Sequence, residues 1–205
     1  MRMGSADGQC GWARGDQAMS IAIDHVGPWT VADVLALPEE RTIRFELLGE
    51  SLVMSPAPGL RHQRASLRLA MILHAAARTA DAPVEVLEAV NVILPSGLVV
   101  PDLVVLDAAA ATENAISLDA EAVQLAIELV SPGSRTIDRK FKPVLYAEAA
   151  IPRFWRVELA PAPILVAYEL DGGRYVKRIT ALAGATAHLE APFPVDIDPA
   201  DLARP

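Results

Sequence analysis

The stretch IELVSPGSRTIDRKFKPVLYAEAAIPRFWRVE, residues 127–158, carries the signals that decide the fold of this chain. Its first apolar run is typical of a strand that ends at a Ser-Pro-Gly turn, and FWRVE after Pro152 is typical of a second strand. Between them we expect a helix over roughly Asp138–Ala149, because proline is tolerated in the first turn of a helix and Pro143 would lie there. This arrangement places Lys142 at the N-terminal edge of the helix.

Further strands are predicted on both sides of this stretch. The runs VEVLEAVNVIL, LVVPDLVVL and VQLAIELVS are rich in Val, Ile and Leu, as expected for strands in the middle of a sheet. Upstream, RTIRFELLGESLVM predicts two strands around Arg44–Leu48 and Leu52–Met54, with a turn at residues 49–51. Downstream, the Asp-Gly-Gly sequence at residues 171–173 predicts a hairpin between ILVAYEL and RYVKRIT.

The strongest helix signal spans His62–Thr79, where apolar residues recur at helical spacing from Ala65 to Ala76. A shorter helix is predicted from the capping residue Thr30 to near Pro38. No internal repeat or linker separates these elements. We therefore predict a single domain over residues 21–205, of the α/β or α+β class, with a mixed central β-sheet flanked by helices.

The composition narrows the class of protein. With 205 residues, 52% of them hydrophobic and 21% charged, the chain can form a full core and is too hydrophobic to be disordered. Its net charge of −8 argues against a protein that coats DNA by electrostatics alone, although a local basic groove is compatible with it. No apolar run approaches the roughly 20 residues that span a bilayer, so no membrane association is predicted.

The first 20 residues are rich in Gly, Ala, Ser and Asp and show no periodicity, so we predict a disordered extension over residues 1–20. They also lack the apolar segment of a secretory signal. The single cysteine, Cys10, lies in this segment and cannot form an intramolecular disulfide. A cytoplasmic protein is the simplest interpretation.

Two carboxylates lie inside otherwise apolar strands, Asp102 in LVVPDLVVL and Glu128 in VQLAIELVS. A charge in a strand core is costly unless it is paired with a cation. Pro101 cannot donate to a strand ladder, so we expect a bulge or a sheet edge there. Two acids on adjacent strands would supply the oxygen ligands that Mg²⁺ requires. The alternative for Asp102 is a solvent-facing position at the start of a strand. The alternative for Glu128 is an ordinary acid near the end of a strand, which is common.

Three other residues complete a candidate site. Lys142 lies in a basic segment, residues 135–142, of a negatively charged protein, and from a helix edge it can reach a phosphate or an attacking water. Glu46 lies in the predicted hairpin and His62 at the start of the long helix. The alternatives are a solvated helix face for Lys142, a surface position for Glu46, and a capping or buried structural role for His62.

These pieces, in this order, resemble the Uma-type family of restriction endonucleases, a bacterial branch of the PD-(D/E)XK nuclease superfamily. RFELLGESLVMSPAPGLRHQ is similar to its N-terminal hairpin and helix, VVPDLVVLD to its Pro-Asp strand, and residues 127–158 to its most recognisable block. The resemblance covers roughly Thr30 to Ile179. It implies a restriction-endonuclease-like fold of the PD-(D/E)XK type.

The resemblance also implies a role for each matching position. Asp102 and Glu128 would ligate Mg²⁺ or Mn²⁺, with the carbonyl of Leu129 as a further ligand. Glu46 would be an additional acid near the metal. Lys142 would orient the attacking water or stabilise charge on the phosphate.

The sequence departs from the expected patterns at two places. The superfamily pattern puts the lysine two residues after the glutamate, where this chain has Val130, and in this family the lysine is understood to have moved to the following helix. The hairpin turn is Gly49-Glu50, whereas the family pattern has an acidic or polar residue followed by glycine. Either Glu46 or Glu50 can therefore face the metal, and we favour Glu46. Tyr146 is expected in the core, or lining the cleft.

The expected function is that of a Mg²⁺-dependent endodeoxyribonuclease that hydrolyses phosphodiester bonds of DNA. A homodimer would bring two sites to two strands, but nothing in the sequence fixes the oligomeric state. One alternative is an inactive nuclease-fold module that binds nucleic acid or protein, and another is a hydrolase of small phosphate esters. The presence of all four candidate site residues favours catalysis.

Overall fold

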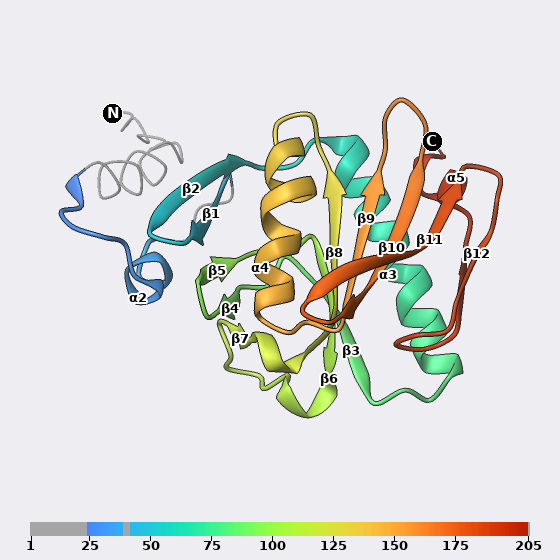
Figure 1. The fold of residues 1–205 in the computed structure, drawn as a ribbon, viewed down its shortest axis with the longest axis horizontal. Helices are drawn as coiled ribbons and strands as arrows, with labels where there is room; N and C mark the ends of the chain where they lie inside the picture. Colours follow the sequence, from blue (N-terminus) through green and yellow to red (C-terminus); the bar gives the residue numbers. More distant parts are fainter. Residues whose placement is uncertain (1–23, 39–41, 205) are drawn as a thin grey trace, which may run out of the picture.

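The computed structural model describes residues 24–38 and 42–204 (Figure 1). The predicted N-terminal extension, residues 1–20, lies outside the described residues. The helices are α2 (Val31–Leu35), α3 (Leu60–Thr79), α4 (Lys142–Glu148) and α5 (Pro199–Ala203), with the 3-10 turns η1 (Ala108–Ala110) and η2 (Ala120–Ala122) and the π-helix η3 (Ile137–Phe141). None of the helices in the described segments is long and apolar enough to cross a membrane.

The strands form two larger mixed sheets and a small one. The first sheet has the order β2-β1-β5-β4-β7 and contains β1 (Ile43–Leu48), β2 (Ser51–Pro56), β4 (Val92–Leu94), β5 (Gly97–Val99) and β7 (Leu118–Asp119). The second has the order β11-β10-β9-β8-β6-β3 and contains β3 (Val84–Glu88), β6 (Leu103–Asp107), β8 (Val123–Val130), β9 (Arg153–Glu158), β10 (Ile164–Asp171) and β11 (Arg174–Leu182). Strands β12 (Ala187–Leu189) and β13 (Val195–Ile197) pair with each other.

The prediction of mixed α and β structure is confirmed, but the prediction of one central sheet is wrong. The run LVVPDLVVL is not one strand: β5 ends at Val99 and β6, in the other sheet, begins at Leu103. Pro101 has no N–H to donate to a ladder, so pairing stops there and the chain passes from one sheet to the other. Asp102 lies in this crossing, where it does not belong to either sheet.

Helices cover both faces of the six-stranded sheet because side chains alternate along its strands (Figure 1). Leu125 and Ile127 of β8 lie in a core cluster with Leu69 and Leu73 of α3. Ala126, between them, lies in a second cluster with Tyr146 of α4. Glu128 lies two residues after Ala126 on the same strand, so it points to the same side of the sheet, where α4 packs.

The predicted hairpin and long helix are confirmed, and Gly97 explains how the hairpin joins its sheet. β1 pairs with β5 so that Leu48 lies opposite Gly97. A Cβ atom at Gly97 would lie 2.0 Å from the carbonyl oxygen of Leu47, and the backbone φ of Gly97 is +151°. Only glycine permits this close approach. The contact fixes β1 against β5 and so places Glu46 beside the sheet crossing.

Candidate active site

The structure brings together the four residues predicted from the sequence. Glu46 of β1, Asp102 in the sheet crossing, Glu128 of β8 and Lys142 at the start of α4 all line one cavity of about 70 Å³. Their exposed fractions are only 3%, 6%, 1% and 2%. We call this space the acidic cavity. Charged side chains are almost never this buried unless they are paired, so their contacts decide what the cavity can do.

Lys142 is the central cation of the acidic cavity. Its ammonium nitrogen lies 2.8 Å from Oε1 of Glu46 and 3.0 Å from Oε1 of Glu128. A third carboxylate, that of Asp138, has Oδ1 at 3.9 Å. Burial lowers the pKa of Lys142, but the surrounding carboxylates of Glu128, Glu46 and Asp138 raise it further, and the net shift is upward. The lysine therefore stays charged at neutral pH.

The local backbone explains how Lys142 reaches the cavity. A π-helix, η3, precedes α4, and Pro143 occupies the first turn of α4 as the sequence predicted. Proline is tolerated in that turn because the N–H it lacks would have no partner there. π-Helical turns are frequent at functional sites. Here the turn places Asp138 and Lys142 on the cavity side, at positions i and i+4.

Asp102 is held by three donors. Its Oδ1 accepts from Arg44 Nη1 at 3.0 Å, and its Oδ2 lies 3.0 Å from His62 Nε2. The backbone N–H of Leu129 also donates to Oδ2, at 2.8 Å. Burial raises the pKa of Asp102, but His62, Arg44 and Lys142 lower it to about 2. Asp102 is therefore an anion throughout the physiological range, oriented from three sides.

Glu128 has the opposite electrostatic character. Burial, together with the neighbouring charges of Asp102, Asp138 and Glu46, raises the pKa of Glu128 well above its usual value, although Lys142 opposes the shift. The hydroxyl of Tyr146 donates to Oε1 at 2.5 Å. Burial also raises the pKa of Tyr146, so its hydroxyl keeps its proton. The prediction that Tyr146 is a core residue is confirmed, and in the core its hydroxyl orients Glu128.

Glu46 and Glu50 have different environments. Oε1 of Glu46 accepts from the N–H of Val100, at 2.8 Å, in addition to its contact with Lys142. Glu50 lies exposed in the turn between β1 and β2. The structure therefore places Glu46, and not Glu50, in the acidic cavity.

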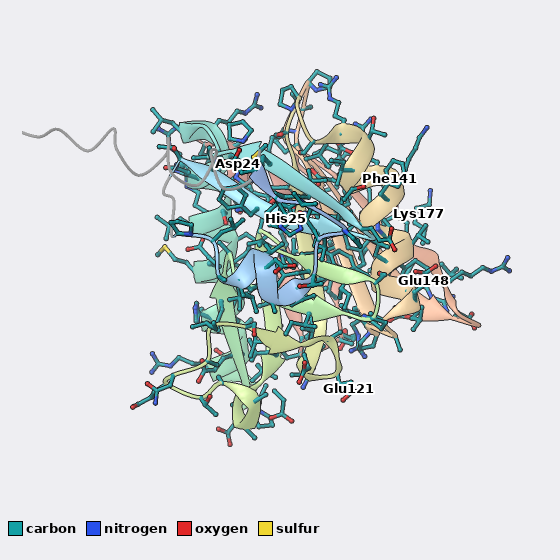
Figure 2. All side chains as sticks on the ribbon, turned by 90° about the vertical axis from the view of Figure 1, so that its left-hand side faces the viewer. Asp24, His25, Glu121, Phe141, Glu148 and Lys177 are labelled. Carbon is teal, nitrogen blue, oxygen red and sulfur yellow. The ribbon has the colours of Figure 1, made fainter. Side chains whose placement is uncertain are left out.

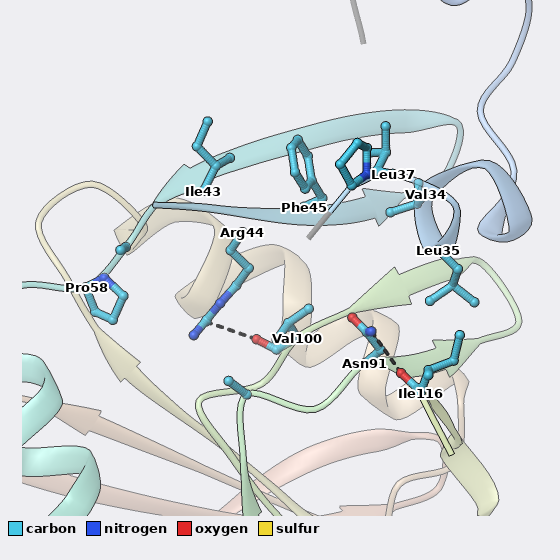
Figure 3. A pocket seen from close by; sticks show the side chains of 13 residues that line it. Val34, Leu35, Leu37, Ile43, Arg44, Phe45, Pro58, Asn91, Val100 and Ile116 are labelled. Atoms are coloured by element: carbon cyan, nitrogen blue, oxygen red, sulfur yellow. Dashed lines mark hydrogen bonds between the residues drawn. The ribbon is translucent and has the colours of Figure 1, made fainter. Parts of the chain in front are cut away.

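Arg44 is a site residue that the sequence analysis missed. It bonds Asp102 and also donates to the carbonyl of Val100 at 3.1 Å, so it ties β1 to the sheet crossing. Figure 3 shows its side chain at the edge of a larger cavity, of about 500 Å³, next to the β1–β2 hairpin. The available signal was its spacing: Arg44 and Glu46 are two residues apart on a strand and so share a face.

Asp138 is the second missed residue. It is buried, and the hydroxyl of Ser134 donates to its Oδ2. Ser131 holds Ser134 in turn, with their hydroxyl oxygens 2.8 Å apart. The signal was the i, i+4 spacing from Lys142, for which the sequence analysis left a solvated helix face open as the alternative. Burial is the main reason that the pKa of Asp138 is raised from 3.8 to about 6.

This pKa gives a testable pH dependence of stability. A carboxyl whose pKa is higher in the folded state stabilises the fold below its unfolded pKa, and this stabilisation is lost as pH rises through the folded value. We expect wild-type protein to lose up to about 3 kcal/mol between pH 4 and pH 7 relative to Asp138→Asn. Urea unfolding across this range measures the difference. Asp119→Asn, at an exposed aspartate, should follow wild type. The expectation would be contradicted if the free energy of unfolding changed with pH in the same way in wild type and in Asp138→Asn.

The donor chemistry of the acidic cavity fits a divalent cation such as Mg²⁺ or Mn²⁺. Buried carboxylate oxygens and the nearby backbone of Leu129 are the hard ligands that these ions prefer. Burial and the neighbouring carboxylates raise the pKa of Glu128, so a cation beside it would favour its charged form. Within residues 24–38 and 42–204, no group of three or more His, Cys, Asp or Glu side chains is arranged to hold a metal ion. The carboxylates instead contact Lys142, Arg44 and His62, so a metal ion would have to exchange with those contacts.

Comparison with known proteins identifies a matching family model and a solved structure of similar fold. The Uma2 family model, described as a putative restriction endonuclease, matches residues 31–203. A crystal structure of a putative nuclease belonging to DUF820 from Anabaena variabilis ATCC 29413 superposes with a TM-score of 0.64, over 86% of this chain and 92% of that chain. The two chains share 15% sequence identity, so this match shows a common fold. The comparison with curated proteins gave no match.

Proposed function

Because the chain belongs to the Uma2 restriction endonuclease family, we propose that it is a metal-dependent endonuclease that hydrolyses phosphodiester bonds of DNA. The observation that carries the proposal is the position of Lys142 between Glu46 and Glu128, with Asp102 in the same cavity. A purely structural core gains little from burying the carboxylates of Glu46, Glu128 and Asp138 around one lysine, because such groups cost more desolvation energy than well-packed apolar residues.

The proposed metal is Mg²⁺ or Mn²⁺. Asp102, Glu128 and the carbonyl of Leu129 would hold it, and Glu46 would be the additional acid beside it. When bound, such a cation polarises the phosphate and lowers the pKa of a bound water. Of the two principal ligands, Asp102 is already ionised and oriented by Arg44.

The remaining residues have roles that follow from their contacts. The ammonium of Lys142 can donate to a phosphate oxygen or to the attacking water, and it places positive charge where the transition state becomes more negative. His62 and Arg44 fix the position of the Asp102 carboxylate. Tyr146 fixes that of Glu128. Preorganised groups of this kind lower the barrier without reorganising during the reaction.

The test is cleavage of supercoiled plasmid and of single-stranded DNA with Mg²⁺, with Mn²⁺ or with EDTA. We expect cutting with either metal, none with EDTA, and at least about a hundredfold loss in Glu128→Gln. Glu121→Gln is the matched control, since Glu121 is exposed and does not line the acidic cavity; Figure 2 shows it at the lower edge of the molecule. Cutting that persists in Glu128→Gln would place the chemistry elsewhere. If neither the wild-type protein nor the variants cut either substrate with Mg²⁺ or Mn²⁺, the inactive nuclease-fold module would be favoured instead.

The pattern of cutting also bears on assembly. Relaxed, nicked plasmid as the sole product needs one site acting on one strand. Linear plasmid formed without a nicked intermediate needs two sites, which a homodimer would supply. We propose the homodimer for the second case.

A further inference from the structure

A second pocket, of about 400 Å³, lies on the outer side of α4, against the β10–β11 hairpin. We call it the basic pocket because its lining includes the cations Arg139, Lys140, Arg156 and Arg174. The rings of Phe154, Tyr168 and Tyr175 also line it. None of these residues takes part in the acidic cavity, so the proposed chemistry does not explain why they are gathered here.

The basic pocket and the acidic cavity lie on opposite sides of one helical segment. Asp138 and Lys142 line the acidic cavity, whereas Lys140 and Val144 line the basic pocket. An α-helix with its side chains is about 10 Å across. A DNA strand whose phosphate lies in the acidic cavity would therefore need only a few further nucleotides to pass around η3 and reach the basic pocket.

The charges of the basic pocket are not balanced within it. Arg139 donates twice to Glu158, at 2.8 Å each, and Arg156 Nε lies 3.2 Å from the same carboxylate. One carboxylate therefore serves two guanidinium groups. In the described part of the chain, Lys140 and Arg174 form no ion pair, and the acid in the pocket lining is Glu148. The pocket is thus locally positive in a chain whose net charge is −8.

The aromatic side chains supply a flat surface next to these cations. The guanidinium carbon of Arg156 lies 5.7 Å from the centre of the half-buried Tyr168 ring. Phe154 lies on the ring as well, with centroids 5.6 Å apart and an interplanar angle of 23°. On the same side of the molecule, Phe141 and Glu148 project outward (Figure 2), and Phe141 is exposed. Aromatic rings beside cations are how proteins bind single-stranded nucleic acid without sequence preference.

We propose that the basic pocket binds one nucleotide of a single DNA strand, a few nucleotides away from the phosphate that the acidic cavity would receive. Its base stacks on the layer formed by Tyr168 and Arg156, and its phosphates contact Lys140 and Arg174. This inference rests on the proposed function, in that DNA is the ligand. The inference goes beyond the proposed function because it assigns a second site, on the far side of α4, that binds a DNA strand without a metal ion.

The test is binding of fluorescein-labelled oligothymidylate in EDTA, followed by fluorescence anisotropy over a series of NaCl concentrations. Because each phosphate contact contributes about −0.7 to the slope of log K against log salt for a single strand, Lys140→Ala/Arg174→Ala should reduce the magnitude of this slope by about 1.4. At low salt its affinity should be about tenfold weaker. Tyr168→Leu should weaken binding about tenfold without changing the slope, since it removes only stacking. Arg78→Ala, at the far end of α3, is the matched control and should bind like wild type.

The outcomes separate this inference from the proposed function. Thermal unfolding first establishes that each variant is folded. Unchanged affinity and slope in the double variant overturn the basic pocket as a strand site, and plasmid cutting by the same protein would leave the proposed function standing. Wild-type protein that cuts plasmid but does not bind oligothymidylate also overturns the pocket alone. Wild-type protein that neither binds nor cuts overturns both.

Discussion

Replacing Lys142 by methionine is expected to lower the free energy of unfolding by about 3–5 kcal/mol in metal-free buffer. Methionine keeps the length and apolar stem of the side chain but removes the charge. The carboxylates of Glu46 and Glu128 would then be buried without their cation, and Asp138 would lose its nearest positive charge. Leaving buried charges unpaired is among the most destabilising changes that a single substitution makes. Urea unfolding in EDTA measures the effect.

The same variant tests whether lysine and metal share one site. Mn²⁺ should stabilise Lys142→Met more than it stabilises wild type, because the carboxylates that the ammonium leaves are then free to bind the cation. DNA cleavage should nevertheless stay at least about a hundredfold below wild type, since the metal does not replace the donor to the phosphate. Lys140→Met is the stability control: this lysine is exposed, and the change should be within about 0.5 kcal/mol. A metal-free Lys142→Met protein as stable as wild type would mean that the carboxylates are protonated and uncharged.

Asp102→Asn is expected to reduce metal-dependent cleavage by about a thousandfold or more. Metal ions contribute several kcal/mol to transition-state stabilisation in phosphate hydrolysis, which corresponds to this factor. Asparagine retains the shape of the side chain and an oxygen that can accept from the N–H of Leu129. It removes the negative charge that His62 and Arg44 hold in place. The loss of cleavage should therefore come with a loss of metal binding, and stability should also fall because Arg44 and His62 lose their ionic partner.

A thermal shift measurement separates these two causes. Wild-type protein should melt at higher temperature as Mg²⁺ or Mn²⁺ is added, and Asp102→Asn should not. Asp107→Asn is the matched control, five residues along the chain: Asp107 is exposed and caps η1 through its contact with Ala109 N–H, which asparagine can also make. Equal metal stabilisation of Asp102→Asn and wild type would place the cation elsewhere in the protein.

Much of the secondary structure could be predicted because its causes are local. The helical spacing of apolar residues located α3, and the turn residues located the β1–β2 and β10–β11 hairpins. The division into two sheets could not be predicted in this way. Apolar alternation shows that a residue is in a strand, but not which partner that strand pairs with. The break at Pro101 was expected as a bulge, yet whether the chain resumes in the same sheet depends on contacts far along the sequence.

The residues of the candidate site likewise fall into those that could be predicted from the sequence and those that could not. Glu46, Asp102, Glu128 and Lys142 were identified because acids in apolar strands and a lysine at a helix edge are unusual, and because they match a family pattern. Arg44 and Asp138 were missed because their signals are common. A charge two residues along a strand, or four along a helix, usually lies in solvent. Only the packing of β1 and η3 against the sheet crossing buries these two side chains.

The crossing between the sheets also determines when the site exists during folding. Glu46 comes from the sheet that the chain begins first, whereas Glu128 and Lys142 come from elements synthesised much later. Contacts between residues so far apart in sequence form late, after the loops between them have closed. A growing or partly folded chain therefore carries these side chains hydrated and apart. The proposed cleavage of DNA would therefore begin only with the completed fold.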